Sequence, residues 1–337
     1  MIEFLSNTNW ITPQIDFLVF LQNLRTTNFE ALNNLFSTIT VFGEIWLPTL
    51  ICAIVYWCFD EKKGIYLFSL FSINVFIIHF LKMIACVYRP WVLNDRVHPF
   101  GNSINMAKSY SFPSGHSGMA SSVVGGTAYL LRKHFIICTL IIVLVLSIGF
   151  SRLWLGVHTP QDVLVGLICG GILVFALAML IPWAEKNDNR YLYLLSIINI
   201  TALIGLLYVR YFNVYPMDYV NGELLVNPAS GIRVTLAYYG YALGLINGCY
   251  LSRKFFKFQA SSGTILNRII RGILGSLMVY FFMINNVSDV LGWKYGSKFV
   301  FVSTFITGFF ITAIYPFAFI KMSEWIENTF NKLILKD

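Results

Sequence analysis

The sequence has few charged residues. Only 12% of its 337 residues are Asp, Glu, Lys or Arg, about half of the roughly 25% that is usual in a soluble domain. In contrast, 57% of the residues are hydrophobic. A soluble fold could not bury this much apolar surface, so the composition argues against a soluble enzyme. It predicts a protein that crosses the membrane several times.

Two other features are missing. The first 13 residues lack the basic start and the apolar run of a signal peptide. The cysteines lack the spacing of metal ligands and stand singly in or beside apolar segments. We interpret them as buried hydrophobic residues, neither disulfide partners nor metal ligands. They are Cys52, Cys58, Cys86, Cys138, Cys169 and Cys249.

Long apolar runs predict an all-α, polytopic transmembrane helical bundle of about nine spans. The apolar run within residues 1–30 is too short to span, and it predicts a helix that lies in the membrane interface. We expect an interfacial segment at 1–30, a core at 31–183 that carries the motifs below, and additional helices at 184–337. The predicted spans are 31–59, 64–85, 116–131, 134–152, 160–183, 191–209, 231–251, 264–287 and 298–320.

Basic residues predict the orientation. The net charge of +8 does not require a nucleic-acid partner, because short loops on the cytoplasmic side of a membrane protein collect Lys and Arg. Loops after the odd-numbered spans carry this excess, so we expect the N-terminus outside and the C-terminus in the cytoplasm. These loop residues are Lys62, Lys63, Arg132, Lys133, Lys186, Arg190, Arg253, Lys254 and Lys257.

Three cations are expected near one membrane depth on the outer side. Lys82 and Arg89 stand at the end of the second predicted span, and Arg152 stands at the end of the fourth. A charge inside a membrane is costly and needs a partner. Too few acids lie near these residues in sequence to neutralise all three. A doubly charged phosphate would suit them, with bidentate contacts from Arg and a point charge from Lys.

The outer loops also hold two histidines beside predicted helix starts. Ser114, Gly115 and His116 begin a helix whose free N–H groups favour an anion. His158 precedes a second helix start and Asp162 follows one turn later, so this carboxylate could hold the Nδ1 proton of His158 and leave Nε2 free to attack. His116 could then act as a general acid.

These residues closely resemble the motifs of the type-2 phosphatidic acid phosphatase superfamily, which also includes the vanadium haloperoxidases. The family pattern is Lys, six residues, Arg-Pro; then Pro-Ser-Gly-His; then Ser-Arg, five residues, His, three residues, Asp. The chain has Lys82 with Arg89-Pro90, then Pro113 to His116, and then Ser151-Arg152 with His158 and Asp162. All three parts are complete and in order.

The resemblance implies an acid-phosphatase-like helical core and a role for each matching residue. Lys82, Arg89, Ser114, Gly115 and Arg152 would bind phosphate. His158 would be the nucleophile, Asp162 would orient it, and His116 would protonate the leaving oxygen and later activate water. The resemblance implies a metal-independent phosphatase without a cofactor. The basic loops, rather than the resemblance, predict a site on the extracytoplasmic face of a plasma membrane or endomembrane, and the sequence indicates no oligomeric state.

Four functions stay open at this point. The first is hydrolysis of a phosphomonoester in a lipid phosphate or lipid diphosphate through a phosphohistidine. The second is a sugar-phosphate phosphatase of the glucose-6-phosphatase type, which the count of nine spans favours. The third is a lipid phosphotransferase, because only the acceptor differs. The fourth is a transporter in which the later spans act, although these spans lack paired acidic groups.

Overall fold

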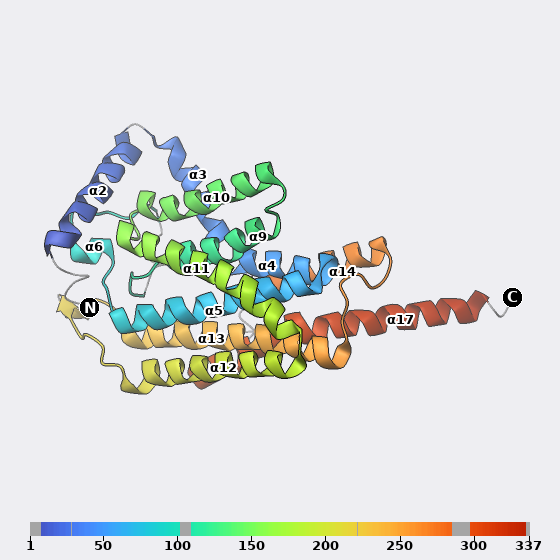
Figure 1. The fold of residues 1–337 in the computed structure, drawn as a ribbon. Helices are drawn as coiled ribbons and strands as arrows, with labels where there is room; N and C mark the ends of the chain where they lie inside the picture. The colour runs from blue at the N-terminus through green and yellow to red at the C-terminus, as the bar shows by residue number, and fades with distance from the viewer. Residues whose placement is uncertain (1–7, 28, 102–108, 221, 285–296, 335–337) are drawn as a thin grey trace. The chain divides into compact units, whose positions relative to one another are not determined.

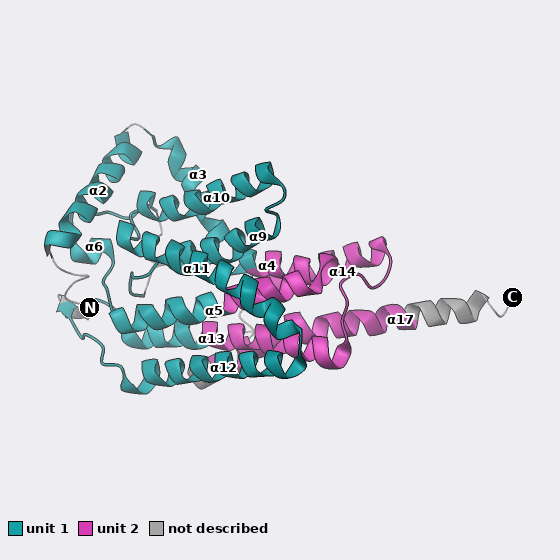
Figure 2. Ribbon diagram, viewed as in Figure 1, with its two compact units in different colours: residues 1–48, 73–236 teal, residues 49–72, 237–337 magenta. Residues whose placement is uncertain are grey.

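The computed structural model describes residues 8–27, 29–101, 109–220, 222–284 and 297–334. Almost all of the regular structure is helical, as the composition predicts. One short antiparallel hairpin pairs β1 (Tyr219–Val220) with β2 (Glu223–Leu224). The chain divides into two compact units, which are residues 1–48 with 73–236 and residues 49–72 with 237–337 (Figure 2).

The helices of the first unit carry the three motifs, and Figure 1 labels most of them. They are α2 (Thr8–Thr27), α3 (Ala31–Ile39), η1 (Thr40–Gly43), α6 (Pro90–Leu93), α8 (Gly115–Met119), η3 (Ala120–Val124), α9 (Gly125–Leu130), α10 (Phe135–Trp154), α11 (Pro160–Glu185), α12 (Asp188–Leu207) and η4 (Tyr208–Phe212).

The second unit takes most of its helices from the C-terminal third of the chain. They are η2 (Val55–Phe59), η5 (Ser252–Phe256), α14 (Ile265–Ile284), α16 (Ser297–Phe309), η6 (Phe310–Ile314) and α17 (Tyr315–Ile334). Three helices contribute residues to both units, and they are α4 (Trp46–Ile54), α5 (Glu61–Ala85) and α13 (Pro228–Leu251). The division of the sequence at residues 30 and 183 stays a prediction.

The polytopic helical fold is confirmed, but the count of nine spans is not. Among the described residues, 6 helices are long and apolar enough to cross a membrane, or 7 if one bent pair is a single span. The predicted segment 116–131 is too short, since α8, η3 and α9 together end at Leu130. The predicted segment 231–251 lies in α13, where glycine and tyrosine lower the hydropathy.

The first predicted span is broken rather than continuous. The helices at Ala31–Gly43 and Trp46–Phe59 meet at an angle of 53°. The 3-10 turn η1 ends at Gly43, which is in contact with His116, because a Cβ at this glycine would lie 3.0 Å from the His116 Cβ. The break therefore brings the middle of this segment against the second motif.

The predicted N-terminal helix is present as α2, and its place in the membrane interface stays a prediction. The helix buries Ile11, Ile15 and Leu18 against the loop around Val97. It also packs on α10. The N-terminal segment therefore covers the loops that hold the first and third motifs.

Small residues allow α8 and η3 to pack backbone to backbone on α11 (Figure 1). A Cβ at Gly166 would lie 2.6 Å from the Ser114 carbonyl oxygen, and a Cβ at Gly170 would lie 2.7 Å from the Gly118 carbonyl oxygen. The four-residue spacing of these two glycines suits such close packing of helices. In the second unit, Gly240 and Gly244 approach the Phe301 and Phe305 carbonyl oxygens in the same way.

Candidate active site

The turn after α10 carries the proposed nucleophile. Gly156 has a φ of +71°, and two hydrogen bonds close the turn around it. The Gly156 N–H donates to the Leu153 carbonyl at 2.9 Å, and the Val157 N–H donates to the Arg152 carbonyl at 3.1 Å. This is the Schellman pattern, in which glycine takes the left-handed conformation at the end of a helix. The chain reverses there and brings His158 back toward Arg152.

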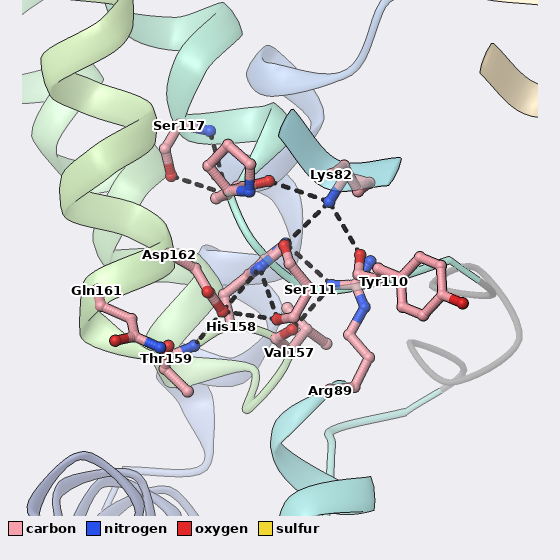
Figure 3. Close-up of polar contacts among 12 residues, drawn as sticks. Lys82, Arg89, Tyr110, Ser111, Ser117, Val157, His158, Thr159, Gln161 and Asp162 are labelled. Carbon is pink, nitrogen blue, oxygen red and sulfur yellow. Dashed lines mark hydrogen bonds and ion pairs between the residues drawn. The ribbon is translucent and has the colours of Figure 1, made fainter. Parts of the chain in front are cut away.

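His158 is almost fully buried and contacts residues from all three motif regions (Figure 3). Its Nε2 atom lies 3.0 Å from Nη1 of Arg89, and its Nδ1 atom lies 3.3 Å from Oγ of Ser111 and 3.4 Å from Oδ2 of Asp162. Arginine can only donate, so Nε2 must accept and Nδ1 must carry the proton. This tautomer leaves the lone pair of Nε2 unprotonated, as the predicted role of His158 as nucleophile requires.

Asp162 is held more tightly than its contact with His158 suggests. Its Oδ2 atom accepts from the Ser111 hydroxyl at 2.6 Å and from the Thr159 N–H at 2.8 Å. The second of these bonds is one half of a capping box at the start of α11, where Pro160 takes the first helical position. The helix start therefore fixes the carboxylate, and Ser111 bridges it to the imidazole.

Lys82 holds a loop rather than standing free. Its Nζ atom donates to the carbonyl oxygens of Tyr110 and Ser111 at 2.9 Å and of Pro113 at 3.0 Å (Figure 3). An ammonium group has three donors, so all of them are in use. Lys82 thus shapes the segment that leads into the second motif and adds positive charge. Its direct contact with phosphate stays a prediction.

The second motif begins a helix that faces the same cluster. Ser114 caps α8, with its Oγ atom 3.4 Å from the Ser117 N–H. The Ser114 N–H donates to the Asp162 carbonyl at 2.9 Å, so the second and third motifs are joined directly. Among the described residues, a Cβ at Gly115 would meet only Ile78, at 3.9 Å. The backbone at Gly115 is therefore open to a ligand. His116 is only partly buried.

Among the described residues, Arg152 has the fewest hydrogen-bond partners of the three cations. It is 8% exposed, and its Nη1 atom donates to Oγ1 of Thr40 at 2.6 Å. Within the described residues its Nε atom is buried without a hydrogen-bond partner. A buried unpaired donor on a charged group is costly. An anion with several acceptor oxygens would satisfy it.

Burial lowers the pKa of His158 well below its usual 6.5, and the positive charges of Arg89, Lys82 and Arg152 lower it further. Both causes disfavour the protonated imidazole. A neutral His158 near pH 7 follows from this, and it agrees with the role that the sequence predicts for this residue. The same cations outnumber the single buried carboxylate of Asp162, which leaves the site with an excess of positive charge before a ligand binds.

All of the residues predicted for the site lie in the first unit and form one cluster. Their mutual contacts and charges join Lys82, Arg89, Ser114, His116, Arg152, His158 and Asp162, and Gly115 lies between Ser114 and His116 in the chain. Two further residues in contact with them, Ser111 and Thr40, were not anticipated. Ser111 stands directly before the second motif, which is a usable signal. Thr40 stands 112 residues from Arg152, and nothing in its local sequence points to the site.

Comparisons with known proteins indicate the family of this chain. Residues 62–187 match the model of the PAP2 superfamily, and residues 236–324 match the model described as PAP2 superfamily phosphatase, transmembrane extension. The first match covers every predicted site residue. The second match covers helices of the second unit. No solved structure matches the chain.

Three curated relatives are similar to part of this chain. Phosphatidylglycerophosphatase B of Bacillus subtilis is 38% identical over 105 residues, which cover 28% of this chain and 49% of the relative. Undecaprenyl-diphosphatase of Sulfolobus acidocaldarius is 27% identical over 147 residues, or 43% of this chain and 68% of the relative. Undecaprenyl-diphosphatase BcrC of Bacillus subtilis is 31% identical over 152 residues, or 43% and 73%. The chain thus spans about half the length of the first relative.

Proposed function

Because the chain belongs to the PAP2 superfamily, we propose that it is a membrane phosphatase that releases phosphate from a lipid phosphate or lipid diphosphate through a phosphohistidine. One observation carries this proposal. The Nε2 atom of His158 lies beside Arg89 in a buried, cation-rich site, while the Nδ1 atom faces Ser111 and Asp162. This arrangement suits attack on a bound phosphoryl group.

In the first step, Nε2 of His158 forms a bond to phosphorus and the bond from phosphorus to the leaving oxygen breaks. His116 donates a proton to that oxygen, which leaves as an alcohol or, from a diphosphate, as a monophosphate. The imidazole of His158 becomes positively charged on phosphorylation. The carboxylate of Asp162 stabilises this charge through Nδ1, and the Ser111 hydroxyl maintains the orientation.

In the second step, His116 accepts a proton from water, and the water oxygen attacks phosphorus. The bond from phosphorus to Nε2 breaks and inorganic phosphate leaves. Arg89, Arg152 and the free N–H groups at the start of α8 oppose the charge on the phosphoryl oxygens in both steps. Such pre-positioned donors contribute most of the rate in comparable sites. The partial exposure of His116 suits a group that meets the leaving oxygen and then water.

The proposed substrate class is a membrane lipid. The names of the curated relatives refer to phosphatidylglycerophosphate and undecaprenyl diphosphate, and this chain is a multi-pass membrane protein. The excess of Lys and Arg in the short loops supports a site on the extracytoplasmic face, with the N-terminus outside and the C-terminus in the cytoplasm. The sugar-phosphate alternative depended on nine spans, a count that is not confirmed. The lipid phosphotransferase alternative stays open, because transfer of the phosphoryl group to a second lipid differs from hydrolysis only in the acceptor.

The test is release of inorganic phosphate by purified wild-type protein in detergent without added metal. The panel contains lipid monophosphates, lipid diphosphates and sugar phosphates, each with and without a lipid alcohol as acceptor. We expect the lipid substrates to be preferred and water to be the acceptor. His158→Ala should abolish turnover, and His134→Ala, at an exposed position outside the cluster, should not. Phosphate release by the His158→Ala variant would contradict the mechanism.

A further inference from the structure

Arg25, near the C-terminal end of α2, lies against the turn that joins Arg152 to His158. Its side chain is buried. Its Nη1 atom donates to the Trp154 carbonyl at 2.6 Å, and its Nη2 atom donates to the His98 carbonyl. Trp154 ends α10, so its carbonyl lacks an intrahelical partner, and a cation there also opposes the negative end of the helix dipole.

Asn33 of α3 completes a closed set of hydrogen bonds around this cap. The Trp154 Nε1 atom donates to Asn33 Oδ1 at 2.9 Å, and the Asn33 Nδ2 atom donates to the Arg25 carbonyl at 3.3 Å. Together with the bond from Arg25 to Trp154, these contacts join α2, α3 and α10. All three residues are buried. Moving any one of these three residues would break hydrogen bonds of the other two.

The opposite end of α2 holds the other end of the same loop. The Gln161 N–H donates to Gln14 Oε1 at 2.9 Å, and the Trp10 Nε1 atom donates to Gln161 Oε1 at 2.6 Å. Gln161 is the second residue of α11. The loop at 155–160, which carries His158, is therefore fastened by α2 at both of its ends.

Burying a guanidinium group at a helix end costs free energy when its only partners are carbonyl oxygens. Within the described residues Arg25 forms no ion pair with a carboxylate. An apolar side chain could fill the space but could not bind two carbonyl oxygens of two separate loops. We propose that Arg25 is a positioning residue for the nucleophile, and that it acts by holding the turn between Arg152 and His158. This inference rests on the proposed function.

The test is the rate constant of phosphohistidine formation, measured in a single turnover with a radiolabelled lipid phosphate and rapid quenching. An unfolded fraction lowers the amplitude of this phase but not its rate constant, so the rate constant separates positioning from mere stability. The variants are Arg25→Met and Arg25→Lys. The matched control is Thr26→Ala, at an exposed neighbour that hydrogen-bonds only within α2.

We expect Arg25→Met to lower the rate constant about 10-fold to 100-fold, because small misplacements of a reacting group have effects of that order. Arg25→Lys should fall between Arg25→Met and the wild type, since an ammonium group can still reach one carbonyl. An unchanged rate constant with a reduced amplitude in Arg25→Met would overturn the proposal. If the wild type forms no phosphohistidine, the proposed function itself fails, which is a separate outcome.

A second inference concerns the second unit, where a groove of about 720 Å³ runs between α14 and the segment that ends at Phe59. Its α14 wall is one face of that helix and is mostly apolar, with Ile269, Ile273 and Leu277 in line. These three side chains are exposed. The volume lies within the range of about 300–1,000 Å³ that is usual for ligand sites.

One end of the groove carries a cation without a matching acid. Arg268 lines the groove one turn into α14. Within the described residues its Nε atom is buried without a hydrogen-bond partner, and it forms no ion pair with a carboxylate. Arg271 lies close enough to add a second positive charge. A basic pocket between transmembrane helices typically binds an anionic lipid head group.

The geometry points to a binding site for an anionic phospholipid, distinct from the substrate site, with the head group at Arg268 and an acyl chain along Ile273 and Leu277. The test is mass spectrometry of the intact protein after exchange into mixed micelles of phosphatidylglycerol and phosphatidylcholine. We expect retained phosphatidylglycerol to exceed phosphatidylcholine several-fold in the wild type. Arg268→Gln should remove this preference.

Two variants make the result decisive. Ser276→Leu places a larger apolar side chain in the groove wall and should reduce retention of both lipids. Arg190→Gln removes an exposed arginine that stacks on Trp183, and it should leave the preference unchanged. The same preference for phosphatidylglycerol in Arg268→Gln and in the wild type would overturn the assignment.

Discussion

Arg89 places its Nη1 atom 3.0 Å from the Nε2 atom of His158, which is the atom expected to attack phosphorus. The same Nη1 atom donates to the Val157 carbonyl at 2.9 Å, and Nε donates to the Ser109 carbonyl at 2.9 Å. Arg89 therefore fixes the tautomer of the imidazole and ties two loops together. When phosphate binds, its oxygens would compete with Nε2 for this guanidinium and free the lone pair for attack.

Replacing Ser111 is predicted to lower kcat nearly as much as replacing Asp162 would. In Ser111→Ala, Asp162 loses its shortest hydrogen bond and His158 loses a neighbour of Nδ1. Leaving a buried carboxylate oxygen short of a donor costs about 1–3 kcal/mol, so we expect kcat to fall about 10-fold to 100-fold. Steady-state kinetics checks this. The control is Ser69→Ala, a buried serine that bonds within α5. Equal kcat values for Ser111→Ala and the wild type would contradict the bridging role.

Arg152 and Thr40 should form a coupled pair. Arg152→Ala should lower kcat/KM by about two to three decades, as expected for the loss of one charge-stabilising donor. Thr40→Val keeps the shape but removes the acceptor at 2.6 Å, and it should have a smaller effect in the same direction. Thr40→Ser should be close to the wild type.

The check on this coupling is a double-mutant cycle. Combining Thr40→Val with Arg152→Ala should add little to Arg152→Ala alone, because residues in direct contact do not contribute independently. Fully additive effects on kcat/KM would mean that Thr40 does not act through Arg152.

The titration of His158 should lie below pH 6.5. Burial and the nearby cations lower its pKa, so the neutral nucleophile persists as the pH falls through 6.5 and is lost only at a lower pH. The direct measurement is NMR of protein with labelled histidine in detergent, without substrate. The His158→Ala variant identifies the signal. A midpoint at or above pH 6.5 would contradict the prediction.

Gly156 should tolerate no side chain without a loss of activity. Its φ of +71° costs other residues roughly 1–2 kcal/mol, and a Cβ there would lie 3.4 Å from Arg25 Nη1. Gly101→Ala is the matched control, since Gly101 has a φ of +60° and no described atom within 4 Å of an added Cβ. We expect similar decreases in Tm for both variants, but a decrease in kcat only for Gly156→Ala. Equal kcat values would contradict the role of the turn.

The sequence alone determined the membrane class and the helical fold, and it predicted site residues that the structure brings together in one cluster. Composition decides solubility, and the spacing of Lys82 to Arg89 or of His158 to Asp162 reflects helix ends, which depend on short-range contacts. The sequence could not determine the number of spans, because α13 and the short helices at 115–130 differ from ideal spans in composition or length.

Only the tertiary structure decided which hydrogen-bond partners these residues have. Lys82 binds three carbonyl oxygens, Ser111 stands between His158 and Asp162, and Arg25 reaches the turn from α2. Each of these contacts joins segments that are far apart in sequence. Their distances depend on how closely helices pack, as where Gly166 and Gly170 admit the backbone of α8 and η3. Local patterns do not encode such distances, because packing depends on the shapes of both partners.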